Sequence, residues 1–369
     1  MFNLLIFFLI LVVIIIVINI LSNKHELFVN YTKCNSRKNT QITQEIFNKY
    51  DFNKTNKNNW DLYIPCGYNY IERELNNINV HNNKQVIFGI KGCDNFVSKN
   101  GIWSLLVKKY GRKNSCKIMP KSYVIRNPLE MRQFYQEHDP KKIYILKSNI
   151  QKQKGIKIVS NIVNINKFTG ILSDYQIIQE LLQNPFIVNG RKINLRIYVL
   201  IVCEKSKITA YIHNQGFMYY TPLKFKKNSI KKDVNITSGY VPRIVYKENP
   251  LTLQDFKLWL ERRGYNKNSL FNNIDKMLIN VFEAIEPSIC ISKHLNNNTR
   301  FQLFGADIAP DENLNCKLME FNKGPDMGAK DERDKLVKKT VQEDIYNLLG
   351  LIKLNRYNEF KKIWTKKRN

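Results

Sequence analysis

Residues 304–323 read FGADIAPDENLNCKLMEFNK, a pattern of two short apolar strands joined by a polar turn. Such a pattern predicts an antiparallel hairpin, which would bring Asp307 on the first strand beside Glu320 on the second. Asn322 shares a face with Glu320, because side chains along a strand repeat every two residues. Three oxygen donors therefore converge at one place on the predicted hairpin.

This cluster of Asp307, Glu320 and Asn322 has the chemistry of a magnesium site. Mg²⁺ prefers hard oxygen ligands and typically joins one or two carboxylates to the phosphates of a nucleotide. Either acid alone could be a solvated group at the end of a strand. Carboxylates at this spacing inside apolar strands favour a site for a metal–nucleotide complex.

Short β-branched runs alternate with helical patterns through the rest of the chain. Strands are expected near residues 86–90, 143–146, 156–159, 193–202 and 208–212, and helices near residues 174–182, 253–262, 274–286 and 331–351. The sequence contains no GxxxxGK[ST] or GxGxxG motif, so neither a P-loop nor a dinucleotide-binding fold is indicated. We predict a mixed α+β domain over residues 85–355.

Four blocks of sequence follow one another in an order that is typical of one enzyme family. Residues 119–125, 144–147, 179–200 (QELLQNPFIVNGRKINLRIYVL) and 304–325 match PxTFxLP, WIVKP, QxYIxxPLLIxGxKFDLRxYVL and FGxD...LLEVNxxP in turn. In these blocks the chain resembles the tubulin-tyrosine-ligase-like family. The resemblance, over about residues 86–351, implies an ATP-grasp fold with the nucleotide in a cleft between lobes.

The resemblance also implies roles for residues outside the hairpin. Lys147 and Arg196 would be catalytic, and a guanidinium suits an acceptor because it binds carboxylates bidentately. Asp307, Glu320 and Asn322 would hold Mg²⁺. The implied ATP-binding residues are Lys99, Lys147, Lys154, Gln179, Leu182, Lys192, Asn194 and Thr237.

The implied reaction is ATP- and Mg²⁺-dependent joining of a carboxylate to an amine through an acyl phosphate. A free amino acid such as glutamate, glycine or tyrosine would be added to an acidic protein, for example a tubulin tail. Lys and Arg number 59 against 31 Asp and Glu, and this net charge of +28 favours a polyanionic partner. A nucleic-acid or anionic-lipid binder would rest on charge alone, because no motif supports it.

Three positions depart from the family pattern within its nucleotide and substrate motifs. Asn194 stands where the family has Asp, and Tyr219 stands where it usually has Arg. Residues 235–238, NITS, replace the family's HLTN. A catalytically inactive, nucleotide-binding homologue that serves as a membrane-tethered binding module is therefore the alternative to a ligase.

The first residues predict a membrane anchor. Residues 2–21, FNLLIFFLILVVIIIVINIL, carry no charged side chain and are long enough to span a bilayer, with a cleaved signal peptide as the alternative. Lys24 and Lys33 follow this run and place the rest of the chain in the cytosol, and seven scattered cysteines fit a reducing compartment. We therefore expect a single-pass membrane protein with a catalytic domain in the cytosol. The anchor would be residues 1–22, followed by a polar tether over 23–84 and, after the domain, a basic tail over 356–369.

Overall fold

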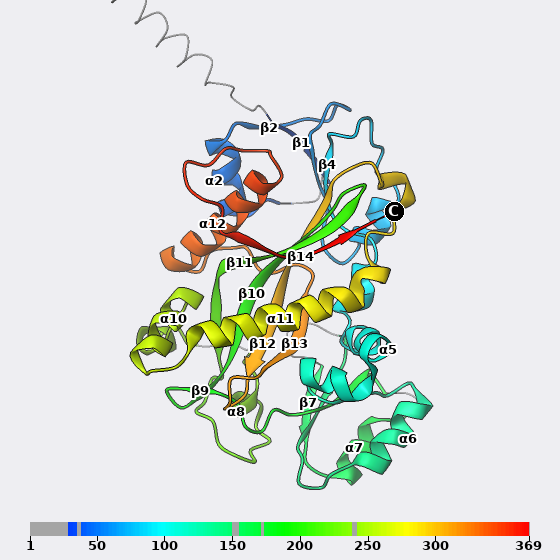
Figure 1. Ribbon diagram of the computed structural model, residues 1–369, viewed down its shortest axis with the longest axis vertical. Helices are drawn as coiled ribbons and strands as arrows, with labels where there is room; N and C mark the ends of the chain where they lie inside the picture. The colour runs from blue at the N-terminus through cyan, green and yellow to red at the C-terminus, as the bar shows by residue number, and fades with distance from the viewer. Residues whose placement is uncertain (1–28, 35–37, 150–154, 171–172, 238–241, 369) are drawn as a thin grey trace, which may run out of the picture.

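The computed structural model describes residues 29–34, 38–149, 155–170, 173–237 and 242–368, which form a mixed α+β fold with two sheets (Figure 1). In spatial order the larger sheet contains β14 (Phe360–Lys367), β11 (Lys207–Tyr220), β10 (Arg191–Cys203), β12 (Arg300–Pro310), β4 (Val86–Phe88), β3 (Leu62–Ile64), β1 (Val29–Lys33) and β2 (Phe52–Lys54). β13 (Cys316–Asn322) pairs with β12, and β9 (Ile187–Val188) pairs with β10. The smaller sheet has the order β5 (Ser122–Val124), β8 (Ile177–Glu180), β6 (Tyr144–Lys147) and β7 (Ile156–Val159). The predicted α+β class is confirmed.

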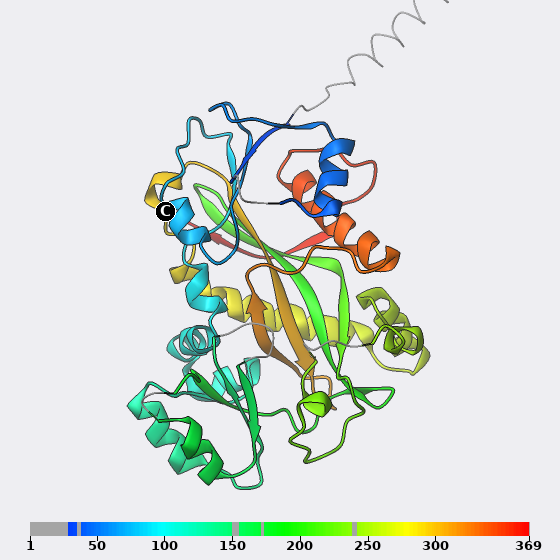
Figure 2. The ribbon, with the colours of Figure 1, turned by 180° about the vertical axis from the view of Figure 1, so that it is seen from behind.

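Helices cover both sheets and connect them. They are α2 (Gln41–Lys49), α3 (Ile71–Leu75), α4 (Cys93–Val97), α5 (Lys99–Ile118), α6 (Pro128–Glu137), α7 (Ile162–Phe168), α8 (Lys232–Asn235), α9 (Val245–Glu248), α10 (Leu253–Arg262), α11 (Lys267–Ile285) and α12 (Glu332–Leu348), with 3₁₀ turns η1 (Glu286–Ser288) and η2 (Lys293–Leu295). In Figures 1 and 2 the smaller sheet, with α6 and α7 beside it, forms a separate lobe at the lower end of the molecule.

The central strand β10 is buried on both faces. Leu195, Ile197 and Val199 contribute to the core under α5 and α11, whereas Tyr198 and Leu200 contribute to the core under α2 and α12. The alternation follows from the two-residue period of a strand. β10 is therefore an almost continuous apolar run, and the polar side chains within it need a specific explanation.

Local capping signals set the starts of several helices. Thr252 and Asp255 form a capping box at the start of α10, and Asn266 caps α11 by accepting a hydrogen bond from the Ser269 N–H. α10 has the predicted bounds 253–262. The helix expected over residues 174–182 is instead strand β8, because its short apolar run pairs with β5 and β6.

Residues 23–84, which we expected to be a polar tether, contain β1, α2, β2, β3 and α3 where the structure describes them. β1, β2 and β3 are only five, three and three residues long, too short to show a period in the sequence. Their apolar residues are nevertheless buried, as Leu62 and Ile64 show. Likewise, the expected basic tail contains β14, which pairs with β11. Both segments are thus parts of the larger sheet.

The prediction of a single-pass membrane protein is wrong by the criterion of helix length and polarity. None of the helices within the described ranges is long and apolar enough to cross a bilayer. The longest, α5 and α11, have 20 and 19 residues, but charged side chains such as Arg112 and Asp275 interrupt them. Residues 2–21, on which the prediction of an anchor was based, lie outside the described residues.

Four of the seven cysteines are paired, as Cys34–Cys66 and Cys203–Cys290. Cys93, Cys116 and Cys316 remain free thiols. Disulfides persist mainly in oxidising environments, so this pairing differs from the reducing compartment expected from the scattered positions. The second bridge ties the end of β10 to a turn 87 residues further along the chain.

We expect Cys203→Ala/Cys290→Ala to lower the free energy of unfolding by about 2–5 kcal/mol, because the bridge restricts the unfolded chain. Urea denaturation measures this loss. Thiol labelling in denaturant is the companion measurement, with three reactive thiols before reduction and seven after it. Seven thiols before reduction would show that neither bridge forms.

Candidate active site

The hairpin predicted over residues 304–323 is present as β12 and β13. In its register Asp307 lies opposite Glu320, and Gly305 lies opposite Asn322. The Asn322 amide nitrogen is 3.4 Å from an oxygen of Asp307 and 3.4 Å from an oxygen of Glu320. The register shifts immediately after Asp307, and such bulges often re-aim a side chain at a functional site. The three oxygen-bearing side chains therefore meet on one face.

Arg196 joins this cluster from the neighbouring strand. It pairs with Asp307 across β10 and β12, and its Nε and Nη2 donate to the two carboxylate oxygens at 2.6 and 3.1 Å. A Cβ on Gly305 would come within 3.0 Å of the Arg196 side chain, so glycine leaves room for the guanidinium. The Tyr219 ring lies 5.0 Å from the guanidinium carbon. The Arg196 guanidinium is thus bound by the Asp307 carboxylate and lies next to the Tyr219 ring.

Burial and ion pairing act against each other in this pair. Burial alone would lower the pKa of Arg196, but the carboxylate of Asp307 outweighs it and raises that pKa well above its usual value. Burial raises the pKa of Asp307, and Arg196 opposes this shift. Asp307 is only 2% exposed, so the ion pair is what makes its burial tolerable.

A pocket opens beside the cluster, between the hairpin and the smaller sheet. Several predicted site residues line it: Lys147, Leu182, Lys192, Asn194, Thr237, Asp307 and Glu320. Its apolar walls are Ile145, Ile156, Leu181, Ile193, Ile236, Ala309 and Met319. Apolar walls with a few convergent charged groups are typical of a ligand site.

Two buried lysines stand out in this pocket, because neither has a carboxylate within ion-pair distance among the described residues. Lys147 is 6% exposed and donates to Gln179 at 2.7 Å. Lys192 is 5% exposed and donates to the Leu182 carbonyl at 2.9 Å and to Asn235 at 3.3 Å. Burial lowers the pKa of Lys147 to about 8 and that of Lys192 to about 7. Such cations would be stabilised by an anionic ligand.

Three other predicted site residues do not line this pocket in the described structure. Gln179 does not line the pocket but positions Lys147 and donates in turn to Ser122 at 2.9 Å. Lys99 begins α5 and lines a neighbouring groove together with Glu320 and Asn322. Lys154 lies outside the described residues.

One residue that sequence reasoning did not select belongs to the site. Asn235 accepts from Lys192 and donates to the carbonyls of Ser229 and Lys231, so it couples the lysine to the α8 segment. It begins the NITS segment, where the family motif has its histidine. The sequence shows Asn235 in place of the family's histidine. Its position in that motif was the signal that could have identified it as a site residue.

Two sheets that enclose buried lysines and paired carboxylates define a class of α+β protein suited to binding an anionic ligand together with a cation. Within that class, the chain belongs to the tubulin-tyrosine ligase family, whose sequence model matches residues 79–356. The resemblance drawn from the four sequence blocks is thereby confirmed.

Curated relatives of this chain are named as tubulin polyglutamylases. The chain is 28% identical over 181 residues to the probable tubulin polyglutamylase TTLL9 of Rattus norvegicus, covering 47% of this chain and 38% of that protein. It is 27% identical over 241 residues to the tubulin polyglutamylase TTLL6 of Homo sapiens, covering 60% and 26%. It is 23% identical over 242 residues to a probable beta-tubulin polyglutamylase of Tetrahymena thermophila, covering 59% and 20%. The chain therefore spans well under half the length of each of these relatives.

The lowered pKa of Lys192 makes a prediction about stability. Its folded-state pKa of about 7 lies below the unfolded value, so between these values the unfolded chain binds a proton that the folded chain does not. As the pH falls from about 9 to about 7, the native protein should lose about 2–3 kcal/mol of unfolding free energy relative to Lys192→Met. Chemical denaturation at both pH values measures this, with the exposed Lys226→Met as the control. A pH-independent difference between the native protein and Lys192→Met would contradict the prediction.

Proposed function

We propose that the protein is an ATP-grasp ligase that uses ATP and Mg²⁺ to join an amino acid to an acidic acceptor protein. The observation that carries the proposal is the meeting of Asp307 and Glu320 with the buried Lys147 and Lys192 around one pocket, with Asn322 beside the two carboxylates. Because the relatives are named as tubulin polyglutamylases, a tubulin tail is the proposed acceptor and glutamate is the amino acid to test first.

The donor set fits a magnesium nucleotide. Two buried ammonium groups without carboxylate partners suit phosphates, and the apolar walls at Leu181 and Met319 suit a base. Glu320 and Asp307 offer hard oxygen atoms, which Mg²⁺ prefers. When bound, the ion would neutralise phosphate charge.

The protein's own groups would act by binding and orientation. Lys147 and Lys192 would balance the negative charge of the phosphates. Arg196, whose Nε and Nη2 hold Asp307, would reach the acceptor carboxylate or the phosphoryl group through its remaining N–H groups. Asp307 fixes the direction of Arg196. The acceptor carboxylate would take the terminal phosphoryl group of ATP, with ADP as the leaving group, to give an acyl phosphate. The amine would then displace phosphate, with loss of a proton, to form the amide.

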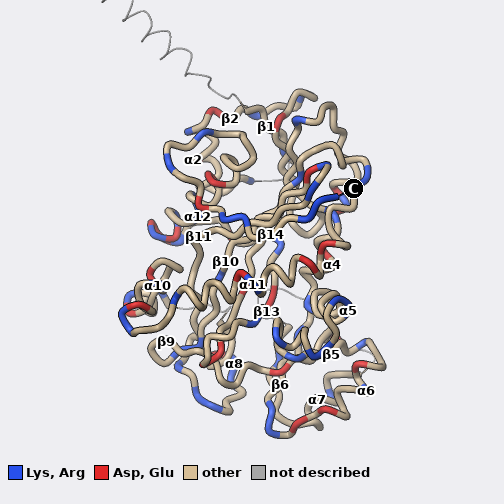
Figure 3. The backbone as a smooth tube through the Cα atoms, in the orientation of Figure 1, with Lys and Arg blue, Asp and Glu red and all other residues tan. Residues whose placement is uncertain are grey.

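The charge of the molecule supports an acidic acceptor. Lys and Arg are spread over both lobes, with Asp and Glu interspersed among them (Figure 3). A net charge of +28 attracts a polyanion over distances longer than any single contact, and salt screens this attraction.

The departures from the family pattern leave the proposed machinery in place. Asn194 still lines the pocket, Tyr219 packs against Arg196, and Asn235 satisfies Lys192. These contacts supply a role for each altered residue within an assembled site, so we favour the ligase over an inactive homologue.

We expect Glu320→Gln to reduce amino-acid incorporation by about 100-fold or more, because it removes a metal-binding charge without changing side-chain shape. The assay incubates the full chain with ATP, Mg²⁺, tubulin and labelled glutamate, glycine or tyrosine. Calorimetry of Mg-ATP binding should show a parallel loss of affinity. Glu312→Gln, in the exposed turn of the same hairpin, is the matched control. If the native protein binds Mg-ATP but incorporates none of the three amino acids, the inactive homologue is the better description.

Arg196→Lys should slow turnover by about 100-fold, since lysine keeps the charge but loses the bidentate geometry that holds Asp307 in place. Steady-state kinetics with saturating ATP would measure the effect. A variant with native turnover would remove Arg196 from the reacting centre.

A further inference from the structure

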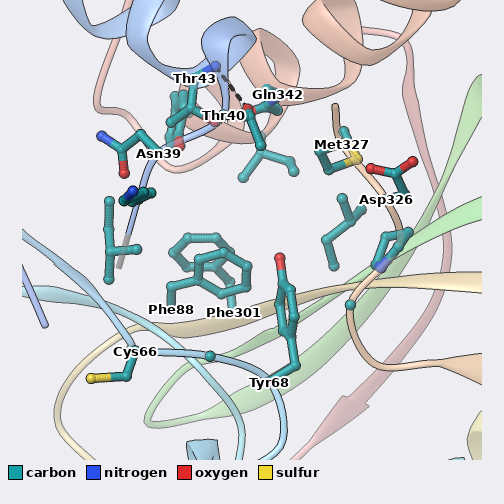
Figure 4. Close-up of a pocket in the computed structure, with 18 residues that line it drawn as sticks. Asn39, Thr40, Thr43, Cys66, Tyr68, Phe88, Phe301, Asp326, Met327 and Gln342 are labelled. Atoms are coloured by element: carbon teal, nitrogen blue, oxygen red, sulfur yellow. Dashed lines mark hydrogen bonds between the residues drawn. The ribbon is translucent and has the colours of Figure 1, made fainter. Parts of the chain in front are cut away.

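A second cavity, of about 410 Å³, lies apart from the pocket described above, between the larger sheet and the helices α2 and α12 (Figure 4). The stacked rings of Phe88 and Phe301, 4.9 Å apart, lie on its sheet side together with Tyr68. Thr43 and Gln342 face it from the two helices. The proposed reaction has no use for this cavity, so its lining calls for a separate explanation.

The helix side of the cavity carries a buried donor. Gln342 is 7% exposed, and its Oε1 accepts a hydrogen bond from the Thr43 hydroxyl at 2.7 Å. Its Nε2 has no hydrogen-bond partner within the described ranges. Because this nitrogen is itself enclosed by protein, it is an unsatisfied polar atom in the wall and not a donor open to the cavity.

The cavity lies on the same face of the larger sheet as the carboxylates of the site. Phe301 and Leu303 precede Asp307 on β12 by even numbers of residues, so all three side chains point to one face. Leu303 is roughly 13 Å from Asp307 along the strand, by the rise per residue. The wall formed by residues 324–327 begins two residues after Asn322, and Tyr68 lines both the cavity and the groove that holds Asn322.

The charges around the cavity point to a neutral occupant. Lys38 and Asp326 are its only charged lining residues among those described, and the Asp326 side chain is 69% exposed. An acidic side chain would therefore find no cluster of cations here. The stacked rings of Phe88 and Phe301 instead make this wall of the cavity apolar.

We propose that this cavity binds one large apolar or aromatic side chain of the acceptor polypeptide, about four residues from the carboxylate that reacts. The inference rests on the proposed function, because it adds a determinant of acceptor choice to that ligase. Tyr68, which lines both the cavity and the groove that holds Asn322, marks the route by which an extended peptide would join the two places. Acceptor selection then combines long-range attraction of an acidic chain with burial of one neutral side chain.

The test uses the full chain and two fluorescein-labelled peptides of glutamate residues. One has a phenylalanine about four residues from its central glutamate, and the other has alanine there. We expect the phenylalanine peptide to bind about tenfold more tightly in fluorescence anisotropy, because it buries an aromatic ring.

A cavity-filling variant supplies the matched comparison. Gly67 lines the cavity, and a Cβ there meets nothing within 4 Å, so Gly67→Phe can place a ring in the space. It should abolish the preference for the phenylalanine peptide. Gly170 has equally open surroundings but follows α7 in the smaller lobe, so Gly170→Phe should retain the preference. Thermal unfolding checks that both variants are folded.

Equal binding of the two peptides to the native protein would overturn the inference, even if Gly67→Phe does not fold. A preference that persists in folded Gly67→Phe would also overturn it, because the ring would then bind elsewhere. Anisotropy is measured without ATP and does not depend on turnover. A failed incorporation assay would thus count against the ligase alone, whereas lost peptide selectivity with normal incorporation would count against the cavity alone.

Discussion

The bidentate ion pair between Arg196 and Asp307 is the interaction on which the site depends. It joins the two central strands β10 and β12 at a fixed register, within a sheet that is largely apolar on both faces. Sliding one strand by a single residue would turn one partner to the opposite face and leave the other buried without its counter-charge. Asp307 also lies opposite Glu320 on β13. The register that pairs Arg196 with Asp307 therefore also determines where the two carboxylates lie.

Two lysines in the pocket beside this pair form no ion pair with a carboxylate among the described residues. Asp307 is occupied by Arg196, whereas Lys147 and Lys192 bond only to neutral groups. Burying such cations works against folding, and function offers a reason to retain them. A phosphate-bearing ligand would convert this unfavourable burial into binding free energy, so binding should stabilise the folded protein.

Predictability from sequence depended on how local each signal was. The hairpin and α10 could be predicted because a turn, a strand period and a capping box lie within a few residues. Strand β8 was expected to be helical, because a short apolar run such as Ile177–Ile178 does not distinguish the two. The second cavity combines residues from Lys38 to Tyr346, and the disulfides join distant cysteines, so no local pattern indicates them. The prediction of a membrane protein with a cytosolic domain was based on an apolar run, on the basic residues that follow it and on the scattered cysteines. None of these features contains three-dimensional information.

Strand β14 has a consequence for how the molecule stays separate from its neighbours. It pairs with residues 207–213, the first half of the 14-residue strand β11, which would otherwise present a row of unpaired backbone groups. This edge strand carries Lys362, Lys366 and Lys367, besides Lys361, which pairs with Asp275, and like charges on an edge strand oppose the addition of another chain. Without residues 360–367, the edge of the sheet would be the unpaired backbone of β11 instead of a strand rich in lysine. Strand β14 thus pairs with the sheet and also opposes association of the molecule with other copies through this edge.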